Sequence, residues 1–298
     1  MSKTILVVGD VMMDVIVSLQ QEMQRGSDAP STIATTFGGV GANVSAWIGH
    51  QGIPCRLISV IGADPWGQLM EKHLQSLGVE TRFAHNASVP TGIVVALSHP
   101  DGERSMFPDS RANQLLSHNQ FSDEVWENVS WLSMSGYTLL HPQTRELAVH
   151  LMRTAKQRDV KVALDPASSA PLSDVSVAEL HQWFAHVDVL LPNEQELQVL
   201  APHAEWQESL RALAKLVPTV IAKRGEHGSA ICHNGTITEI AAIATKVIDT
   251  VGAGDAYAAG TIAALSRGED VVTAAENGAR VATLALNTRG AQPASRLP

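Results

Sequence analysis

The chain has 298 residues, 45% of them hydrophobic, which suits one large α/β domain with a substantial buried core. Its formal net charge of −9, without any run of lysines and arginines, argues against a nucleic-acid-binding protein. The only cysteines, Cys55 and Cys232, lie far apart beside apolar residues, so we expect a reducing, cytoplasmic location and neither a signal peptide nor a membrane span.

The N-terminal third of the chain contains strand-like runs joined mainly by loops. Residues 4–17 predict a first strand, and the runs at 14–19, 31–37, 81–85 and 91–107 predict a small β appendage. The last run folds back as a hairpin around Pro100, Asp101 and Gly102. We assign the appendage to discontinuous segments near residues 12–20, 32–38 and 90–108, and the helical patterns at 41–50 and 65–77 to the large domain.

From residue 131 onward, fully apolar runs alternate with helical patterns. The runs at 131–136, 160–166, 187–193 and 218–225 predict strands that are covered on both faces, and the patterns at 142–158, 176–185 and 193–216 predict crossover helices. The chain is therefore expected to be a single α/β domain over residues 1–298, with a doubly wound, mainly parallel sheet flanked by helices. Asp165, Asn193 and Lys223 end three of these strands, at the edge where such sheets bind ligands.

The stretch DTVGAGDAYAAG, residues 249–260, predicts a helix that begins with small residues and one acid. A first turn made of Gly252, Ala253 and Gly254 lets bare backbone N–H groups approach an anion, and the helix dipole favours negative charge there. A carboxylate beside that anion is useful if Asp255 accepts the proton of a hydroxyl that attacks a phosphoryl group. The alternative is an ordinary glycine-rich helix start in which Asp255 only favours the dipole.

Other nucleotide and metal motifs fail on their residues. A Walker loop requires Lys-Ser or Lys-Thr after its glycines, and a dinucleotide fingerprint requires a glycine where this chain has Tyr257. The sequence also contains no H-E-x-x-H, paired-cysteine or G-x-S-x-G pattern.

A second glycine-rich helix start, FGGVGAN at residues 37–43, favours the phosphoryl-transfer interpretation of residues 249–260 over an ordinary helix start. Together with DTVGAGD, about 210 residues later and in the same order, it resembles the two signatures of the ribokinase-like carbohydrate kinases, the family that includes the B-type phosphofructokinases. The resemblance covers essentially the whole chain. It implies a ribokinase-like fold in which the small β-sheet is a lid that closes over the sugar and in many members pairs two subunits, so a homodimer is expected.

The resemblance also implies roles for individual residues. Asp255 matches the catalytic base, and the backbone of Gly252, Ala253 and Gly254 matches the anion hole. Matches to the sugar-binding positions are Asp14, Gly39 and Asn43. The positions that bind the nucleotide phosphates of ATP are matched by Asn193, Lys223, Gly225 and Gly228. The position that organises Mg²⁺ and its water is matched by Glu196.

A monovalent-cation site is implied by Asp249 and the carbonyl of Val251, which makes K⁺ activation an expectation. The loop TRGAQPAS resembles the segment that completes this site in ribokinases, but here it is one residue short between Arg289 and Gly290. Each of these positions also has an ordinary structural reading: Asn43 as a helix cap, Glu196 as a first-turn acid and Lys223 as a solvated charge.

The acceptor is expected to be a small sugar or sugar derivative phosphorylated at a primary hydroxyl. Ribose is weakened as a candidate because Met12 and Val40 replace an asparagine and a lysine that contact ribose in ribokinases. Arg111 stands where many members have a small residue and would suit a carboxylate or phosphate, although a solvated lid charge is the alternative. A nucleoside kinase and a non-catalytic sugar or nucleotide sensor remain the competing functions.

Overall fold

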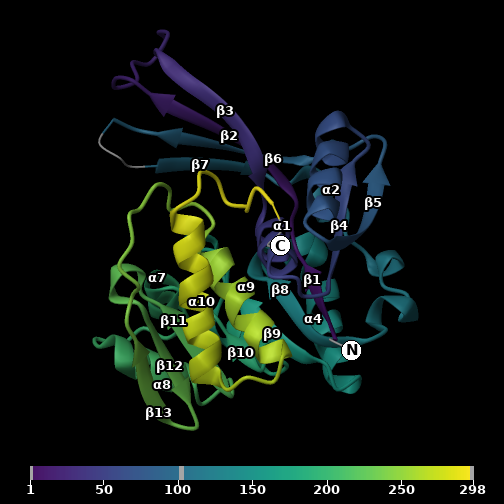
Figure 1. Cartoon of the computed structure of the whole chain (residues 1–298), viewed down its shortest axis with the longest axis vertical. Helices are drawn as coiled ribbons and strands as arrows, with labels where there is room; N and C mark the ends of the chain where they lie inside the picture. Colours follow the sequence, from purple (N-terminus) through teal and green to yellow (C-terminus); the bar gives the residue numbers. More distant parts are fainter. Residues whose placement is uncertain (1–2, 101–103, 296–298) are drawn as a thin grey trace.

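The computed structural model describes residues 3–100 and 104–295. Within these residues the chain forms a large sheet covered by helices on both faces and a separate small sheet that projects from one end (Figure 1). This arrangement confirms the predicted doubly wound α/β fold with a small second sheet.

The large sheet follows the order β13-β12-β11-β10-β9-β8-β1-β4-β5. All pairs from β11 to β5 are parallel, whereas β12 and β13 add an antiparallel edge. Its strands are β1 (Thr4–Val8), β4 (Cys55–Gly62), β5 (Val79–Asn86), β8 (Val129–Ser135), β9 (Lys161–Asp165), β10 (Val189–Leu190), β11 (Thr219–Lys223), β12 (Ser229–His233) and β13 (Thr236–Ile240). Every residue of β1 is buried, as expected for a strand covered on both faces.

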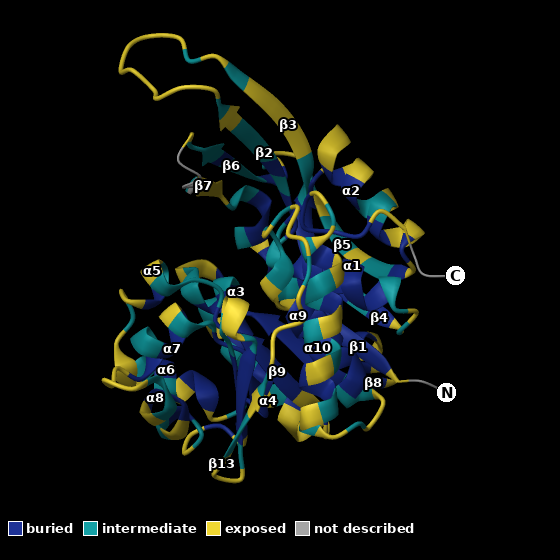
Figure 2. Ribbon diagram, turned by 60° about the vertical axis from the view of Figure 1, so that its left-hand side comes forward, coloured by how far each residue is buried: buried dark blue, intermediate teal, exposed yellow. Residues whose placement is uncertain are grey.

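Helices on the two faces of this sheet bury two apolar cores (Figure 2). One core is covered by α4 (Pro142–Gln157), α6 (Val177–Phe184), α7 (Glu194–Leu200) and α8 (Trp206–Leu213), with the short α3 (Gly136–Leu140) and α5 (Ser169–Leu172) nearby. The other core is covered by α1 (Val40–His50), α2 (Pro65–Ser76), α9 (Ala253–Ser266) and α10 (Val271–Leu286). Short 3₁₀ turns are η1 (Arg111–Leu115), η2 (His118–Gln120), η3 (Asp123–Trp126) and η4 (Gly225–His227).

The small sheet has the order β3-β2-β6-β7. Its strands are β2 (Met12–Leu19), β3 (Ser31–Gly38), β6 (Gly92–Ser98) and β7 (Arg104–Asp109). The predicted hairpin is confirmed by the antiparallel pairing of β6 with β7, although residues 101–103 of its turn lie outside the described residues. The strands fall in the segments that the sequence assigns to the lid.

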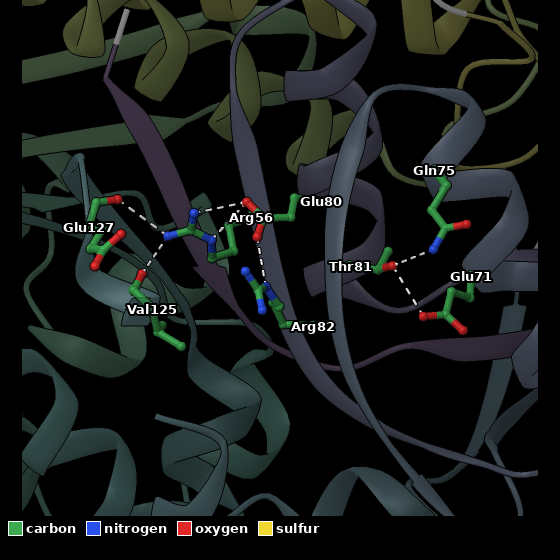
Figure 3. A network of polar contacts seen from close by, with 8 residues as sticks. All are labelled: Arg56, Glu71, Gln75, Glu80, Thr81, Arg82, Val125 and Glu127. Carbon is green, nitrogen blue, oxygen red and sulfur yellow. Dashed lines mark hydrogen bonds and ion pairs between the residues drawn. The ribbon is translucent and has the colours of Figure 1, made fainter. Parts of the chain in front are cut away.

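Two predictions for the N-terminal third were wrong. Residues 4–17 are not one strand: the chain leaves the large sheet after Val8, and at Val11 both backbone groups pair with the side chain of Asn113 instead of a strand. The run at 81–85 belongs to β5, at the edge of the large sheet, where Arg56 of β4 bonds Glu80 and the carbonyl of Val125 (Figure 3).

The helical pattern at 193–216 is also divided. The structure ends α7 at Leu200 and begins α8 at Trp206. Pro202 lies between them, and a proline cannot supply the backbone N–H that a continuous helix requires. The strands β4, β12 and β13 were not anticipated from the sequence.

Candidate active site

The start of α9 provides the expected backbone N–H groups. Its N-cap, Gly252, has φ 74°, and a Cβ atom there would lie 2.6 Å from the Cβ atom of Ala291, so only glycine fits. The N–H groups of Gly254 and Asp255 lie in the first turn, where no helical carbonyl precedes them. This turn therefore offers donors and a positive dipole end to an anion.

The two glycine-rich segments meet at this turn. Asn43, in the first turn of α1, donates from Nδ2 to Oδ2 of Asp255 at 2.8 Å, across 212 residues of chain. Gly39 caps α1 with φ 92°, and a Cβ atom there would lie 2.6 Å from the carbonyl oxygen of Asp10. Residues that the sequence assigns to acceptor binding and to catalysis are thus in direct contact.

The surroundings of Asp255 change its acidity. Burial raises its pKa to about 7, with a further increase from Asp165 and Asp10, while Asn43 and Lys223 oppose the shift. An Asp with its reference pKa would be fully ionised at neutral pH. Here the carboxyl titrates near neutrality, the range in which a general base works best.

Lys223, at the end of β11, forms the cationic centre of the site. Its Nζ atom lies 2.6 Å from Oδ2 of Asp165, which ends β9. Burial lowers the pKa of Lys223, but Asp165, Glu196 and Asp255 together raise it above its ordinary value, so the ammonium stays charged. A Cβ atom added to Gly254 would lie 3.6 Å from Nζ of Lys223, so the first turn of α9 lies beside this ammonium.

Asn193 and Glu196 form a capping box at the start of α7. The Glu196 carboxylate accepts from the backbone N–H and the Nδ2 group of Asn193 at 2.8 and 2.7 Å, while Oδ1 of Asn193 accepts from the Glu196 N–H. Glu196 is only 2% exposed, and burial together with Asp165 raises its pKa to about 7. The structure thus places Glu196 among the carboxylates near Lys223.

A cavity of about 650 Å³ opens on one side of the segment at 249–254. Its lining includes the charged Lys223 and the backbone of Gly225, Gly228 and Gly254. It also includes the apolar side chains of Ile243, Val247, Ala282 and Leu286. Such a lining suits a ligand that combines a flat apolar ring with an anionic group.

A second cavity, of about 420 Å³, lies on the other side of this segment and beneath the small sheet. It is lined by Asp14, Asp249, Val251 and Arg289, among others, whereas Thr250, Ala253 and Gly254 line the first cavity. One turn of chain therefore separates the two cavities.

Asp14 faces the second cavity from β2. Burial and the neighbouring Asp10 raise its pKa to about 7. Because Asp10 also raises the pKa of Asp255, the three carboxyls occupy one region of the molecule.

Asp249 connects the start of α9 to the loop that follows α10, at the second cavity. Its carboxylate accepts from the backbone N–H of Val251 and of Gly290, each at 3.1 Å.

Arg111, which the sequence suggests as a substrate contact, pairs with Asp109 at 2.7 Å and is not among the described residues lining either cavity. Arg289 is the arginine that lines the cavity.

Several residues of the site were not predicted. Asp165 was noted from the sequence as the end of a predicted strand at the ligand-binding edge, but it was given no role in the site. Asp10 and Arg289 carry no such signal, because only the fold shows which cavity they face. Among the described residues, no group of three or more His, Cys, Asp or Glu side chains is arranged to hold a metal ion.

Comparison with known proteins identifies the family of the chain. Residues 2–297 match the description "pfkB family carbohydrate kinase". The chain belongs to this family. It is 27% identical to a ribokinase of Haemophilus influenzae, over 98% of this chain and 95% of the relative, and 26% identical to a 5-dehydro-2-deoxygluconokinase of Bacillus subtilis, over 92% and 87%.

The solved structure of an Arabidopsis thaliana ribokinase in complex with ribose and ATP has the same fold. It superposes with a TM-score of 0.84 at 26% identity, covering 99% of this chain and 96% of that one. The pfkB chain described here is thus a carbohydrate kinase, and ribokinase-like kinases use ATP. No helix in the described ranges is long and apolar enough to span a membrane.

Proposed function

We propose that the protein transfers the γ-phosphoryl group of ATP to a primary hydroxyl of a small sugar or sugar derivative. The observation that carries the proposal is the division of two cavities by residues 249–254, the segment that leads into the first turn of α9. Asp255 follows this segment directly and lines neither cavity itself. ATP occupies the larger cavity, with its base against the apolar side chains and its terminal phosphate at the helix start. The sugar occupies the smaller cavity.

In this proposal Asp255 accepts the proton of the attacking hydroxyl. The oxygen forms a bond to the γ-phosphorus while the bond to the bridging oxygen of ADP breaks, and the proton moves to the carboxylate. The first-turn N–H groups of Gly254 and Asp255, with Lys223, stabilise the charge on the transferring group. Gly225 and Gly228 leave room for the nucleotide phosphates beside Lys223, and Asn193 orients Glu196.

ATP is proposed to bind with Mg²⁺. The chain fits this ion, because Mg²⁺ at nucleotide sites keeps several waters and uses one or two carboxylates with the phosphates, not an all-protein cage. Glu196 would hold it through water, and the ion would neutralise charge on the polyphosphate.

The Asp249 carboxylate and the Val251 carbonyl are proposed to hold K⁺. Replacing KCl by choline chloride at constant ionic strength should then lower turnover, and equal rates in the two salts would refute the K⁺ site.

The sugar site is proposed to use Asp14, Gly39 and Asn43 for hydroxyl groups. Met12 is 3% exposed and contacts the Asn113 amide, so it offers no polar group in place of the asparagine found in ribokinases. Arg289 supplies a cation to the cavity, which favours a substrate that carries a carboxylate or phosphate. Arg111 remains a candidate for the same role if its pairing with Asp109 is exchanged for substrate.

We also propose that the small sheet is a lid and that two lids pair in a homodimer. The strand register places Ile33 and Phe107 on the face opposite Asp14. These side chains are 64% and 55% exposed, and an uncovered apolar sheet face is suited to pairing with a second copy. The cytoplasm is the proposed location.

The test is a coupled ADP-release screen over pentoses, hexoses, sugar acids, sugar phosphates and nucleosides with ATP and Mg²⁺. We expect ADP release that depends on one class of sugar and falls at least about 100-fold in Asp255→Asn. Preferred turnover of a nucleoside would establish the nucleoside-kinase alternative. Binding of sugar and nucleotide without any turnover would establish the sensor.

A further inference from the structure

Gln292 lies in the loop that follows α10 and is 8% exposed. Its Nε2 group donates to Oδ1 of Asn43 at 2.9 Å, across 249 residues. Asn43 in turn donates from Nδ2 to Oδ2 of Asp255 at 2.8 Å. A short line of amides therefore connects the C-terminal loop, α1 and the start of α9.

The direction of these hydrogen bonds is chemically significant. The oxygen and the NH₂ group of an amide are nearly equal in size, so the partners decide which of them faces a given neighbour. With Gln292 donating to its oxygen, Asn43 must present its NH₂ group to Asp255. The reversed Asn43 amide would place its oxygen against the carboxylate and would disfavour the ionised form.

The backbone around Gln292 is held in place. Trp47 of α1 donates from Nε1 to the carbonyl oxygen of Ala291 at 2.9 Å. The adjoining Ala291 side chain closes against Gly252, the N-cap of α9. The loop is thus fixed to both helices that carry the line of amides.

His73 of α2 neighbours Gln292. Its ring stacks on Phe37, at the end of β3, with centroids 4.3 Å apart. Among the described residues, His73 Nε2 and Gln292 Oε1 are both buried without a hydrogen-bond partner. Burial lowers the pKa of His73 and the neighbouring Gln292 opposes that shift, which indicates that the ring and the carboxamide oxygen adjoin.

We infer that Gln292 is a positioning residue, which orients the Asn43 amide so that its NH₂ group faces the catalytic carboxylate. The inference rests on the proposed function in one respect, the assignment of Asp255 as the base. Gln292 touches neither substrate in this account and acts through Asn43.

The test measures the carboxyl directly and needs no substrate. Protein labelled with carbon-13 at aspartate carboxyls is titrated by NMR, and the Asp255 resonance is identified by its loss in Asp255→Asn. In Gln292→Met, which keeps the shape but removes the amide, the Asp255 midpoint should rise by about half a unit to one unit, because one hydrogen bond to the ionised form is weakened. Gln292→Glu should raise it further, since its carboxylate accepts from the Asn43 NH₂ group and adds negative charge.

The matched control is Gln51→Met. Gln51 also lies beside α1, donates to the Trp47 carbonyl at 2.9 Å and accepts from Asn277, but it has no link to Asp255. We expect an unchanged Asp255 midpoint in this variant. Midpoints in Gln292→Met and Gln292→Glu equal to the wild-type value would overturn the inference, even if both variants lost thermal stability. If Gln292→Met does not fold, Gln292→Glu decides alone. A failure to find a sugar substrate would leave this titration unaffected.

Discussion

The raised pKa of the partly buried Asp255 carboxyl makes the stability of the fold depend on pH. Its folded-state pKa is about 7, against an ordinary value of 3.8, so the folded chain keeps a proton that the unfolded chain has released. The contribution of Asp255 to stability is therefore fully present below the unfolded pKa and is lost as the pH rises from about 4 to about 7. Asp255→Asn removes this loss, because the amide has nearly the same shape and does not titrate.

The size of the effect follows from the shift. Between pH 5 and the folded pKa of about 7 there are about two units, which correspond to about 3 kcal/mol at 1.36 kcal/mol per unit. Because Asp255 is only partly buried, water reduces the penalty, and we expect about 1–2 kcal/mol. Effects of the substitution that do not depend on pH, such as a changed hydrogen bond with Asn43, cancel when the two pH values are compared.

The assay is urea unfolding of wild type and Asp255→Asn at pH 5 and pH 8, followed by circular dichroism. The variant should gain about 1–2 kcal/mol relative to wild type at pH 8 compared with pH 5. The control is Asp28→Asn, at an exposed loop position, which should show no such difference. An equal change at both pH values in Asp255→Asn would refute the raised pKa of this carboxyl.

Three further outcomes are expected. Gly252→Ala should lower the free energy of unfolding by about 2–4 kcal/mol, because Gly252 has a positive φ and the added Cβ would meet Ala291. The control Gly268→Ala, with φ 85° but no described atom within 4 Å of the added Cβ, should lower it by about 1 kcal/mol. Equal losses in urea titrations of the two variants would contradict this expectation. Lys223→Met should lower kcat by roughly 100-fold or more and destabilise the fold at neutral pH, because Asp165 loses its partner, and unchanged kinetics would refute its role. Ile33→Glu should shift the mass measured by light scattering from dimer to monomer, and a wild-type monomer would contradict lid pairing.

Sequence patterns were sufficient where each segment has one clear period. Continuous apolar runs from residue 131 onward predicted β8, β9 and β11. They failed between Val8 and Met12, because Gly9 and Asp10 interrupt the apolar run without showing that the chain changes sheets there. Likewise, the strand-like run at 81–85 does not indicate with which sheet it pairs.

The candidate site shows the same division. Glycines and acids at helix starts indicated Asp255, Asn43 and Gly252, since backbone approach to an anion requires particular residue types at fixed spacing. Spacing could not show that Asn43 contacts Asp255, that Gln292 completes this line, or that burial raises the Asp255 pKa to about 7. Those features depend on contacts between segments more than 200 residues apart in the chain.

The central claim is that donor and acceptor meet at the boundary formed by residues 249–254. The most direct measurement is a crystal structure of Asp255→Asn with Mg²⁺, a non-hydrolysable ATP analogue and the sugar identified by ADP release. We predict the terminal phosphate at the N–H groups of the first turn of α9 and one primary hydroxyl of the sugar between that phosphate and residue 255. A terminal phosphate bound away from this turn, or a sugar bound outside the cavity lined by Asp14, would contradict the account.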